Sequence, residues 1–283
     1  MVERAAELGL RALAITDLNG VYALPKAFRQ AKQHTEVKLI SGAELTLRDH
    51  PPISFLAKNR AGYGLLCRMI TRAHEGKPKG RAFLEWHEIL SFLELPASES
   101  LIVIPSTRLD TLDQIQWRDL RERAADRIHL PLQRLLDGRD RLRAERVLAL
   151  SQESNFPVFA SNDAHYHIGE RRMLHDVLTA TRVRSSLRES GRSLFSNAER
   201  HLKSPQQMAR LFSDLPHCLE NSLQIADQCS FSLSELRYFY PSEWIPPHFD
   251  ASSYLRHLVE QGEKMRYPAG TPANVQKQIQ HEL

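Results

Sequence analysis

The stretch "ASNDAHYH" at residues 160–167 places one carboxylate and two imidazoles directly after a short apolar run. That run, residues 156–159, has the composition of a buried strand, and the side chains of a strand alternate between two faces. If the chain stays extended beyond it, Asp163, His165 and His167 point to the same side. An acid and an imidazole at a strand end are rarely needed for packing, so Asp163 and His165 are candidate metal ligands. For His167, a surface or packing role is favoured.

Apolar runs of this kind recur along the first half of the chain, separated by segments with helical spacing. The pattern predicts an α/β fold with a parallel sheet or a barrel. In such a barrel, the residues just beyond the C-terminal ends of the strands converge on one face. The expected strands span residues 11–16, 37–41, 53–57, 101–104, 128–132 and 157–160, and the expected helices span 24–33, 64–73, 112–125 and 141–154.

Helical spacing dominates after residue 168, where the strand signal fades. We therefore expect a barrel over residues 1–168, a helical appendage over 169–235, and a proline-broken connection with two helices over 236–283. The connection contains prolines at 241, 246 and 247. The last helix ends without Gly, Pro or a polar tail, which predicts that the natural fold continues beyond Leu283.

Composition sets the limits of the interpretation. With 283 residues, 42% hydrophobic and 25% charged, the chain can bury a substantial core. No stretch approaches the ~18 apolar residues that cross a bilayer, and the first residues lack a signal-peptide core, so the cytoplasm is the default location. Three separated cysteines predict buried thiols rather than a disulfide framework. A net charge of +4 is compatible with a polyanionic partner but does not establish one.

Two further acidic residues follow expected strands. Asp17 ends "AITD" and Glu44 ends "LISGAE". Carboxylates together with imidazole suit Mn, Zn, Fe or Mg, and such a cluster could activate a water molecule for phosphoester hydrolysis. Asp17, which precedes Leu18-Asn19-Gly20, could instead shape a turn. His74, at the end of an expected helix, is read from its position as a helix-end cation rather than a ligand.

A basic run follows residue 180. Arginine offers forked donors to phosphate, so Arg182, Arg184, Arg188 and Arg192 are weak candidates for nucleic-acid binding. Charge runs of this kind usually form a solvated surface, and that interpretation is favoured here.

The ordered series of motifs resembles a known family. "RALAITDLNGV", "LISGAELTL", "FASNDAHYH" and "ERHLKSPQQMARLF" look, in this order, like the N-terminal region of bacterial error-prone DNA polymerases, which are relatives of the polymerase III alpha subunit. Their first domain is a PHP (polymerase and histidinol phosphatase) domain. The resemblance implies a distorted barrel with a metal cluster at its C-terminal face. It places Glu44, Asp163 and His165 on metal-ligand positions and His74 on another.

This chain also departs from the family's pattern. The family's first strand, with its His-x-His motif, lies before the part that matches here, and Leu18 stands where phosphatase-type relatives have His. Ser106 and Thr107 occupy a position that is often Cys or His. We therefore expect an incomplete barrel that binds at most a single Mn, Zn or Mg ion weakly and does not hydrolyse phosphoesters.

The resemblance implies a role within a larger protein. The family's palm domain, which carries the nucleotidyl-transfer site, would begin beyond "VQKQIQHEL", so this chain alone is expected not to polymerise DNA. The leading hypothesis is an N-terminal piece of a translesion polymerase whose degenerate PHP domain braces the palm domain and contacts DNA or other replication and repair proteins. Two alternatives stay open, namely a stand-alone metal-dependent phosphoesterase and a nucleic-acid-binding protein that uses the arginines.

Overall fold

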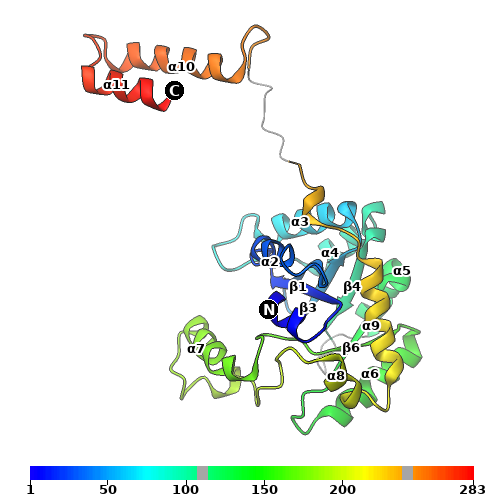
Figure 1. Ribbon diagram of the computed structural model, residues 1–283. Helices are drawn as coiled ribbons and strands as arrows, with labels where there is room; N and C mark the ends of the chain where they lie inside the picture. Colours follow the sequence, from blue (N-terminus) through cyan, green and yellow to red (C-terminus); the bar gives the residue numbers. More distant parts are fainter. Residues whose placement is uncertain (107–113, 238–244) are drawn as a thin grey trace. The chain divides into compact units, whose positions relative to one another are not determined.

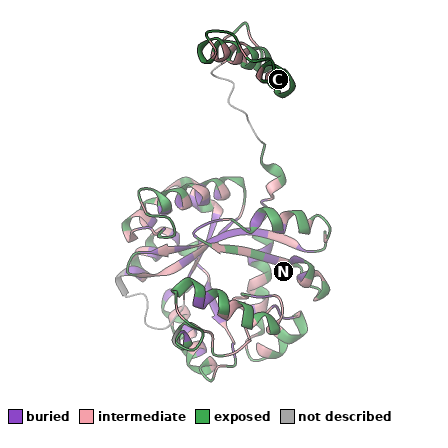
Figure 2. Ribbon diagram, turned by 90° about the vertical axis from the view of Figure 1, so that its left-hand side faces the viewer, coloured by how far each residue is buried: buried purple, intermediate pink, exposed green. Residues whose placement is uncertain are grey.

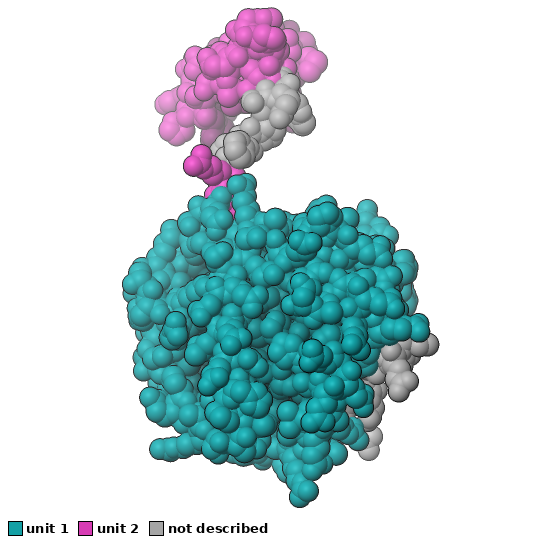
Figure 3. Space-filling model, turned by 90° about the vertical axis from the view of Figure 1, so that its right-hand side faces the viewer, with its two compact units in different colours: residues 1–235 teal, residues 236–283 magenta. Residues whose placement is uncertain are grey.

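The protein forms two compact units, residues 1–235 and 236–283 (Figures 1 and 3). The computed structural model describes residues 1–106, 114–237 and 245–283. Unit 1 contains both the expected barrel region, 1–168, and the expected helical region, 169–235. Pro241 of the expected connection lies outside the described residues.

Unit 1 is built on two small sheets. The four-stranded sheet has the order β1-β2-β3-β4, and β5 pairs with β6 in a second sheet. An isolated β-bridge between Val103 and Ile128 connects the two sheets. Together they form an open β-layer that does not close into a barrel. All six apolar runs form strands, so the expected α/β fold with an incomplete barrel is confirmed. The strands are β1 (Ala12–Leu18), β2 (Lys38–Leu47), β3 (His50–Ala57), β4 (Leu101–Pro105), β5 (Leu130–Gln133) and β6 (Val158–Ser161).

One strand departs from the parallel arrangement that the apolar runs predicted. β1 pairs with β2, and β5 with β6, in parallel, but β3 runs antiparallel to both β2 and β4. Only two residues separate β2 from β3, and such a short link can join antiparallel strands but cannot cross over to a parallel one. Asp49 in this link has a φ of 58°, a left-handed conformation that aspartate tolerates.

The helices lie largely where helical spacing predicts them. Ser204 and Gln207 form the expected capping box before α8. The eight-residue helix α4 was not predicted, and the first residues of the helix expected from residue 112 lie outside the described part. The α-helices of unit 1 are α1 (Val2–Glu7), α2 (Leu24–Ala31), α3 (Arg60–His74), α4 (Trp86–Leu93), α5 (Gln114–Ala124), α6 (Asp140–Ser154), α7 (Arg172–Val183), α8 (Pro205–Leu211) and α9 (Pro216–Gln228).

In the described part of the chain, short 3-10 helices join these elements. They span Pro96–Ser100, Ala125–Arg127, Gly169–Arg171, Gly191–Ser193 and Leu233–Glu235.

The two faces of the four-stranded sheet have different environments. On β2, Ala43, Leu45 and Leu47 belong to the main hydrophobic core, where they join Phe55 of β3 and Leu66 of α3. Figure 2 shows this buried centre. The alternate residues of β2, including Glu44, point to the opposite face because strand side chains alternate. The core therefore fixes the face on which Glu44 lies.

Unit 2 contains the helices α10 (Ala251–Arg266) and α11 (Ala273–Glu282). The Asp250 side chain caps α10 by accepting hydrogen bonds from the backbone N–H groups of Ser252 and Ser253. Apolar side chains of both helices, including Leu255, Val259 and Ile279, line a shared hollow. Across both units, none of the helices in the described residues has the length and apolar character needed to cross a membrane.

Candidate metal-binding cavity

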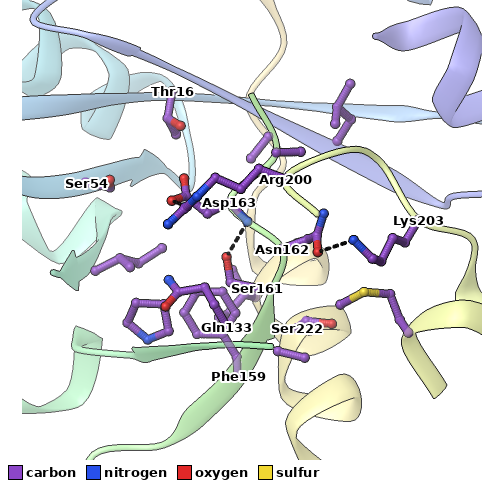
Figure 4. A pocket seen from close by; sticks show the side chains of 18 of the residues that line it. Thr16, Ser54, Gln133, Phe159, Ser161, Asn162, Asp163, Arg200, Lys203 and Ser222 are labelled. Carbon is purple, nitrogen blue, oxygen red and sulfur yellow. Dashed lines mark hydrogen bonds and ion pairs between the residues drawn. The ribbon is translucent and has the colours of Figure 1, made fainter. Parts of the chain in front are cut away.

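A cavity of about 1070 Å³ lies between the two sheets, on the face of the four-stranded sheet that carries Glu44. The four-stranded sheet contributes residues from alternate positions, such as Thr16, Glu44 and Ser54, as strand alternation requires. Gln133 of β5 and Phe159 of β6 line the opposite side, and Figure 4 shows side chains from both sheets facing this hollow.

The cavity brings together two of the predicted ligands. Glu44 lies near the C-terminal end of β2, paired in register with Leu18 of β1 and Ser54 of β3. Asp163 follows the C-terminal end of β6, and both residues line the cavity. Two carboxylates that are 119 positions apart in the sequence thus share one hollow.

The chain does not stay extended through the "NDAH" segment. β6 ends at Ser161, and Asp163 has a φ of 45°. The backbone N–H of Asp163 donates to the Ser161 hydroxyl at 3.3 Å, which closes this local turn (Figure 4). Strand alternation therefore does not place His165 and His167 on the same side as Asp163. His165 does not line the cavity, although its Nε2 lies 3.5 Å from Asp163 Oδ1.

The carboxylate of Asp163 forms an ion pair with Arg200. The Arg200 side chain is only 15% exposed, and its guanidinium carbon lies 4.5 Å from the centre of the Phe195 ring. Guanidinium forms strong charge-assisted hydrogen bonds with carboxylates, so it competes with a metal ion for this ligand. The role of Arg200 was missed in the sequence, where it is one of several scattered basic residues.

A second cation, Lys203, holds the same strand end. Its side chain is 5% exposed, and Nζ donates to Asn162 Oδ1 at 3.2 Å (Figure 4). The Lys203 ammonium also lies 3.1 Å from a carboxylate oxygen of Glu199. Because buried charges require partners, these contacts fix the segment beside Asp163 in one arrangement.

His165 makes its ring contacts with the region of α7. Its ring lies 5.2 Å from that of His175, measured between centroids, and 4.8 Å from that of Phe195. Burial lowers the pKa of His175; His165 and Arg182 nearby lower it further, and Asp176 opposes the shift.

The other two candidates lie outside the cavity lining. His74 Nε2 is 2.8 Å from the backbone oxygen of Asn19. The Asp17 carboxylate accepts from the backbone N–H of Ala23, as a turn-shaping residue would. Asp17 pairs in register with Ala43, so alternation places it on the opposite face of the sheet from Glu44. The structure therefore does not bring Asp17 or His74 into the cavity with Glu44.

Among the described residues, the donor set is smaller than a multi-ion catalytic centre requires. Within the described residues, His, Cys, Asp and Glu side chains form no group of three or more that could hold a metal ion. A catalytic metal usually has three protein ligands and an open position. Glu44 and Asp163 supply two carboxylates, and Arg200 already contacts one of them.

The remaining candidates have simple environments. Cys218 and Cys229 are buried, and burial raises the pKa of each thiol to about 11, as expected for unreactive thiols. Arg182, Arg184 and Arg188 are exposed. The side chain of Arg192 lies outside what the structure describes.

Comparison with known proteins defines the class of this fold. Residues 1–139 match the PHP domain family. Residues 1–139 are thus similar to a PHP domain, and β6, which lies beyond these residues, pairs with β5 within the same unit.

The whole chain is similar to error-prone DNA polymerases. It is 38% identical over 99% of its length to the error-prone DNA polymerase of Pseudomonas aeruginosa, 38% identical over 100% to that of Methylococcus capsulatus, and 35% identical over 100% to error-prone DNA polymerase 1 of Agrobacterium fabrum. In each case it spans 26% of the relative's length. The crystal structure of PsfC from Pseudomonas syringae PB-5123 is 14% identical, with a TM-score of 0.40 over 58% of this chain and 66% of that chain.

Proposed function

We propose that this chain is the N-terminal part of an error-prone, translesion DNA polymerase, in which its degenerate PHP domain has a structural role in DNA replication and repair. The observation that carries the proposal is similarity across the full chain to polymerases of which it spans about a quarter. The palm domain, with the nucleotidyl-transfer site, would belong to the rest of such a protein.

The cavity chemistry supports a structural role. Asp163, which the resemblance to PHP domains puts on a metal-ligand position, forms an ion pair with Arg200 at the cavity. An ion pair on a partly buried carboxylate stabilises the strand end, whereas a catalytic site needs an open coordination position. Any metal binding by Glu44 and Asp163, with His165 and His74 as the other predicted ligands, would be weak and limited to one ion of Mn, Zn or Mg.

The partners follow from the same proposal. The parent protein would bind DNA in the cytoplasm, and its palm domain would pack on this chain. Other replication and repair proteins would dock on the remaining surface. A contribution to DNA binding from Arg182, Arg184, Arg188 and Arg192 stays a prediction.

The full-length parent protein provides the direct test. The adjoining genomic sequence should encode a palm domain with paired acidic residues in the same reading frame. In that protein, deletion of residues 1–283 should abolish primer extension because the palm loses its support. Asp163→Asn should leave extension within about twofold, since the carboxylate takes no part in nucleotidyl transfer.

Two results would overturn this proposal. The first is a genomic sequence with no adjoining palm domain. The second is hydrolysis of a generic phosphodiester by the isolated chain with Mn²⁺, lost in Asp163→Asn while circular dichroism shows an intact fold. Hydrolysis of this kind would establish the stand-alone phosphoesterase instead.

A further inference from the structure

The helix α7 carries an apolar surface that faces solvent. Met173, Leu174, Val177 and Leu178 are 75%, 49%, 42% and 61% exposed. Residues spaced by one, four and five positions lie on the same side of a helix, so these four side chains form one continuous arc. In Figure 1, α7 lies at the periphery of unit 1.

The opposite side of α7, which faces the rest of unit 1, is the more polar one. Thr179 is buried and His175 is half-buried. The His175 ring stacks on that of Phe195, with centroids 4.8 Å apart and planes inclined by 12°. Arg172 donates to the backbone oxygen of Phe195 at 2.7 Å. A surface helix normally buries its apolar side, whereas α7 turns its apolar side to solvent and its more polar side to the rest of unit 1.

We propose that α7 is a docking site for an acidic amphipathic helix of another protein. The docking surface consists of Met173, Leu174, Val177 and Leu178. A contiguous exposed apolar surface of this kind marks an interaction site, and an apolar row at helical spacing suits helix-on-helix packing. The proposal does not depend on the polymerase assignment.

The charge around this surface selects the partner. Arg171, Arg182 and Arg184 are exposed and lie at the ends of α7, and the exposed Arg188 follows four residues after Arg184 in the sequence. Glu170 and Glu189 are the exposed acidic residues between positions 170 and 189. A partner helix with acidic residues along its apolar stripe would complement both features.

Other occupants fit less well. Two copies of α7 packed on each other would bring their arginines together, and like charges at an interface are unfavourable. DNA would satisfy the arginines but would leave the apolar row in water. Helices that lie on membranes usually insert Trp or Phe beside their leucines, and this surface has neither.

A designed peptide pair tests the proposal on the whole chain. One 18-residue helical peptide carries Leu at every third or fourth position with flanking Glu residues, and the other has Lys in place of Glu. Fluorescence anisotropy should show at least about tenfold tighter binding of the Glu peptide, because only its charge complements the arginines. Arg182→Glu with Arg188→Glu should reverse this preference, whereas Arg141→Glu, at an exposed site on α6, should not.

The apolar contribution has a matched control. Leu178→Ser should weaken binding of the Glu peptide about tenfold through the loss of a buried leucine contact. Leu136, which is also 61% exposed, lies outside α7, and Leu136→Ser should leave binding unchanged.

Four outcomes would overturn the proposal. The first is that neither peptide binds, and the second is that Leu178→Ser and Leu136→Ser weaken binding equally. The third is that size-exclusion chromatography shows self-association of the chain through Leu178 without binding of the peptide. The fourth is that anionic phosphatidylserine vesicles or a single-stranded oligonucleotide bind to α7 in preference to the Glu peptide.

Discussion

The helices α7 and α9 have similar lengths, but α9 buries its apolar side whereas α7 exposes its apolar side to solvent. α9 buries Cys218, Ile225 and Ala226, and Asn221 on α9 donates to the backbone oxygen of Val158 in β6 at 2.7 Å. α7 exposes its apolar row and is held through Arg172 and His175. An amphipathic sequence therefore determines which residues share a side of a helix, but tertiary contacts determine which way that side points.

The largest expected effect concerns the buried side of α9. Ile225→Asp should lower the free energy of unfolding by about 3–5 kcal/mol, because it removes buried apolar contact and buries a carboxylate without a partner. The matched change on α7, Leu178→Asp, should alter the free energy of unfolding by less than about 0.5 kcal/mol, as for other surface substitutions. Urea denaturation measures both, and comparable losses in the two variants would show that the apolar row of α7 is buried in solution.

A smaller effect is expected where polar contacts attach α7. Arg172→Met removes the hydrogen bond to Phe195 and the 3.4 Å contact of Arg172 with Asp176. Because Arg172 is partly exposed, the loss should be about 1 kcal/mol. Hydrogen exchange should then quicken in α7 and stay unchanged in α9. Arg182→Met serves as the control, and equal acceleration in both variants would refute the attachment.

A pH dependence should distinguish the same two helices. The pKa of His175 is lowered in the folded protein by burial, with His165 and Arg182 adding to the effect and Asp176 opposing it. The unfolded chain therefore takes up the proton first, so the stabilising contribution of neutral His175 is complete above its ordinary pKa of about 6.5 and is lost as the pH falls below it.

Hydrogen exchange at pH 7.5 and pH 5.5, corrected for the intrinsic exchange rate, measures this effect. Protection of α7 should decrease at the lower pH by more than that of α9, and His175→Gln should reduce the difference. Equal changes in both helices, with no effect of the substitution, would contradict the assignment to His175.

The sequence predicts the elements better than their directions. Apolar runs located every strand in the described residues, because buried strands need continuous apolar side chains. The reversed direction of β3 was missed because it depends on a link of two residues rather than on periodicity. α4 was missed because eight residues contain few helical repeats.

The site was predictable only in part. Glu44 and Asp163 follow strand ends, so a shared cavity could be inferred from the alternation of strands and helices. The pairing of Asp163 with Arg200 joins residues 37 positions apart, and no local pattern predicts such a tertiary contact. The turn at Asp163 was likewise hidden, because "ASNDAH" continues an apparent strand.

Metal titration is the most direct test of the central proposal that Arg200 holds the carboxylate of Asp163 in place of a catalytic metal. After chelator treatment, calorimetry with Mn²⁺ should show at most one weakly bound ion in the wild-type chain. Arg200→Met, with its fold verified by circular dichroism, should bind Mn²⁺ about tenfold more tightly because the carboxylate loses its guanidinium partner, and Arg182→Met should behave like the wild type. Tight binding of more than one ion by the wild-type chain, unaffected by Arg200→Met, would contradict the account.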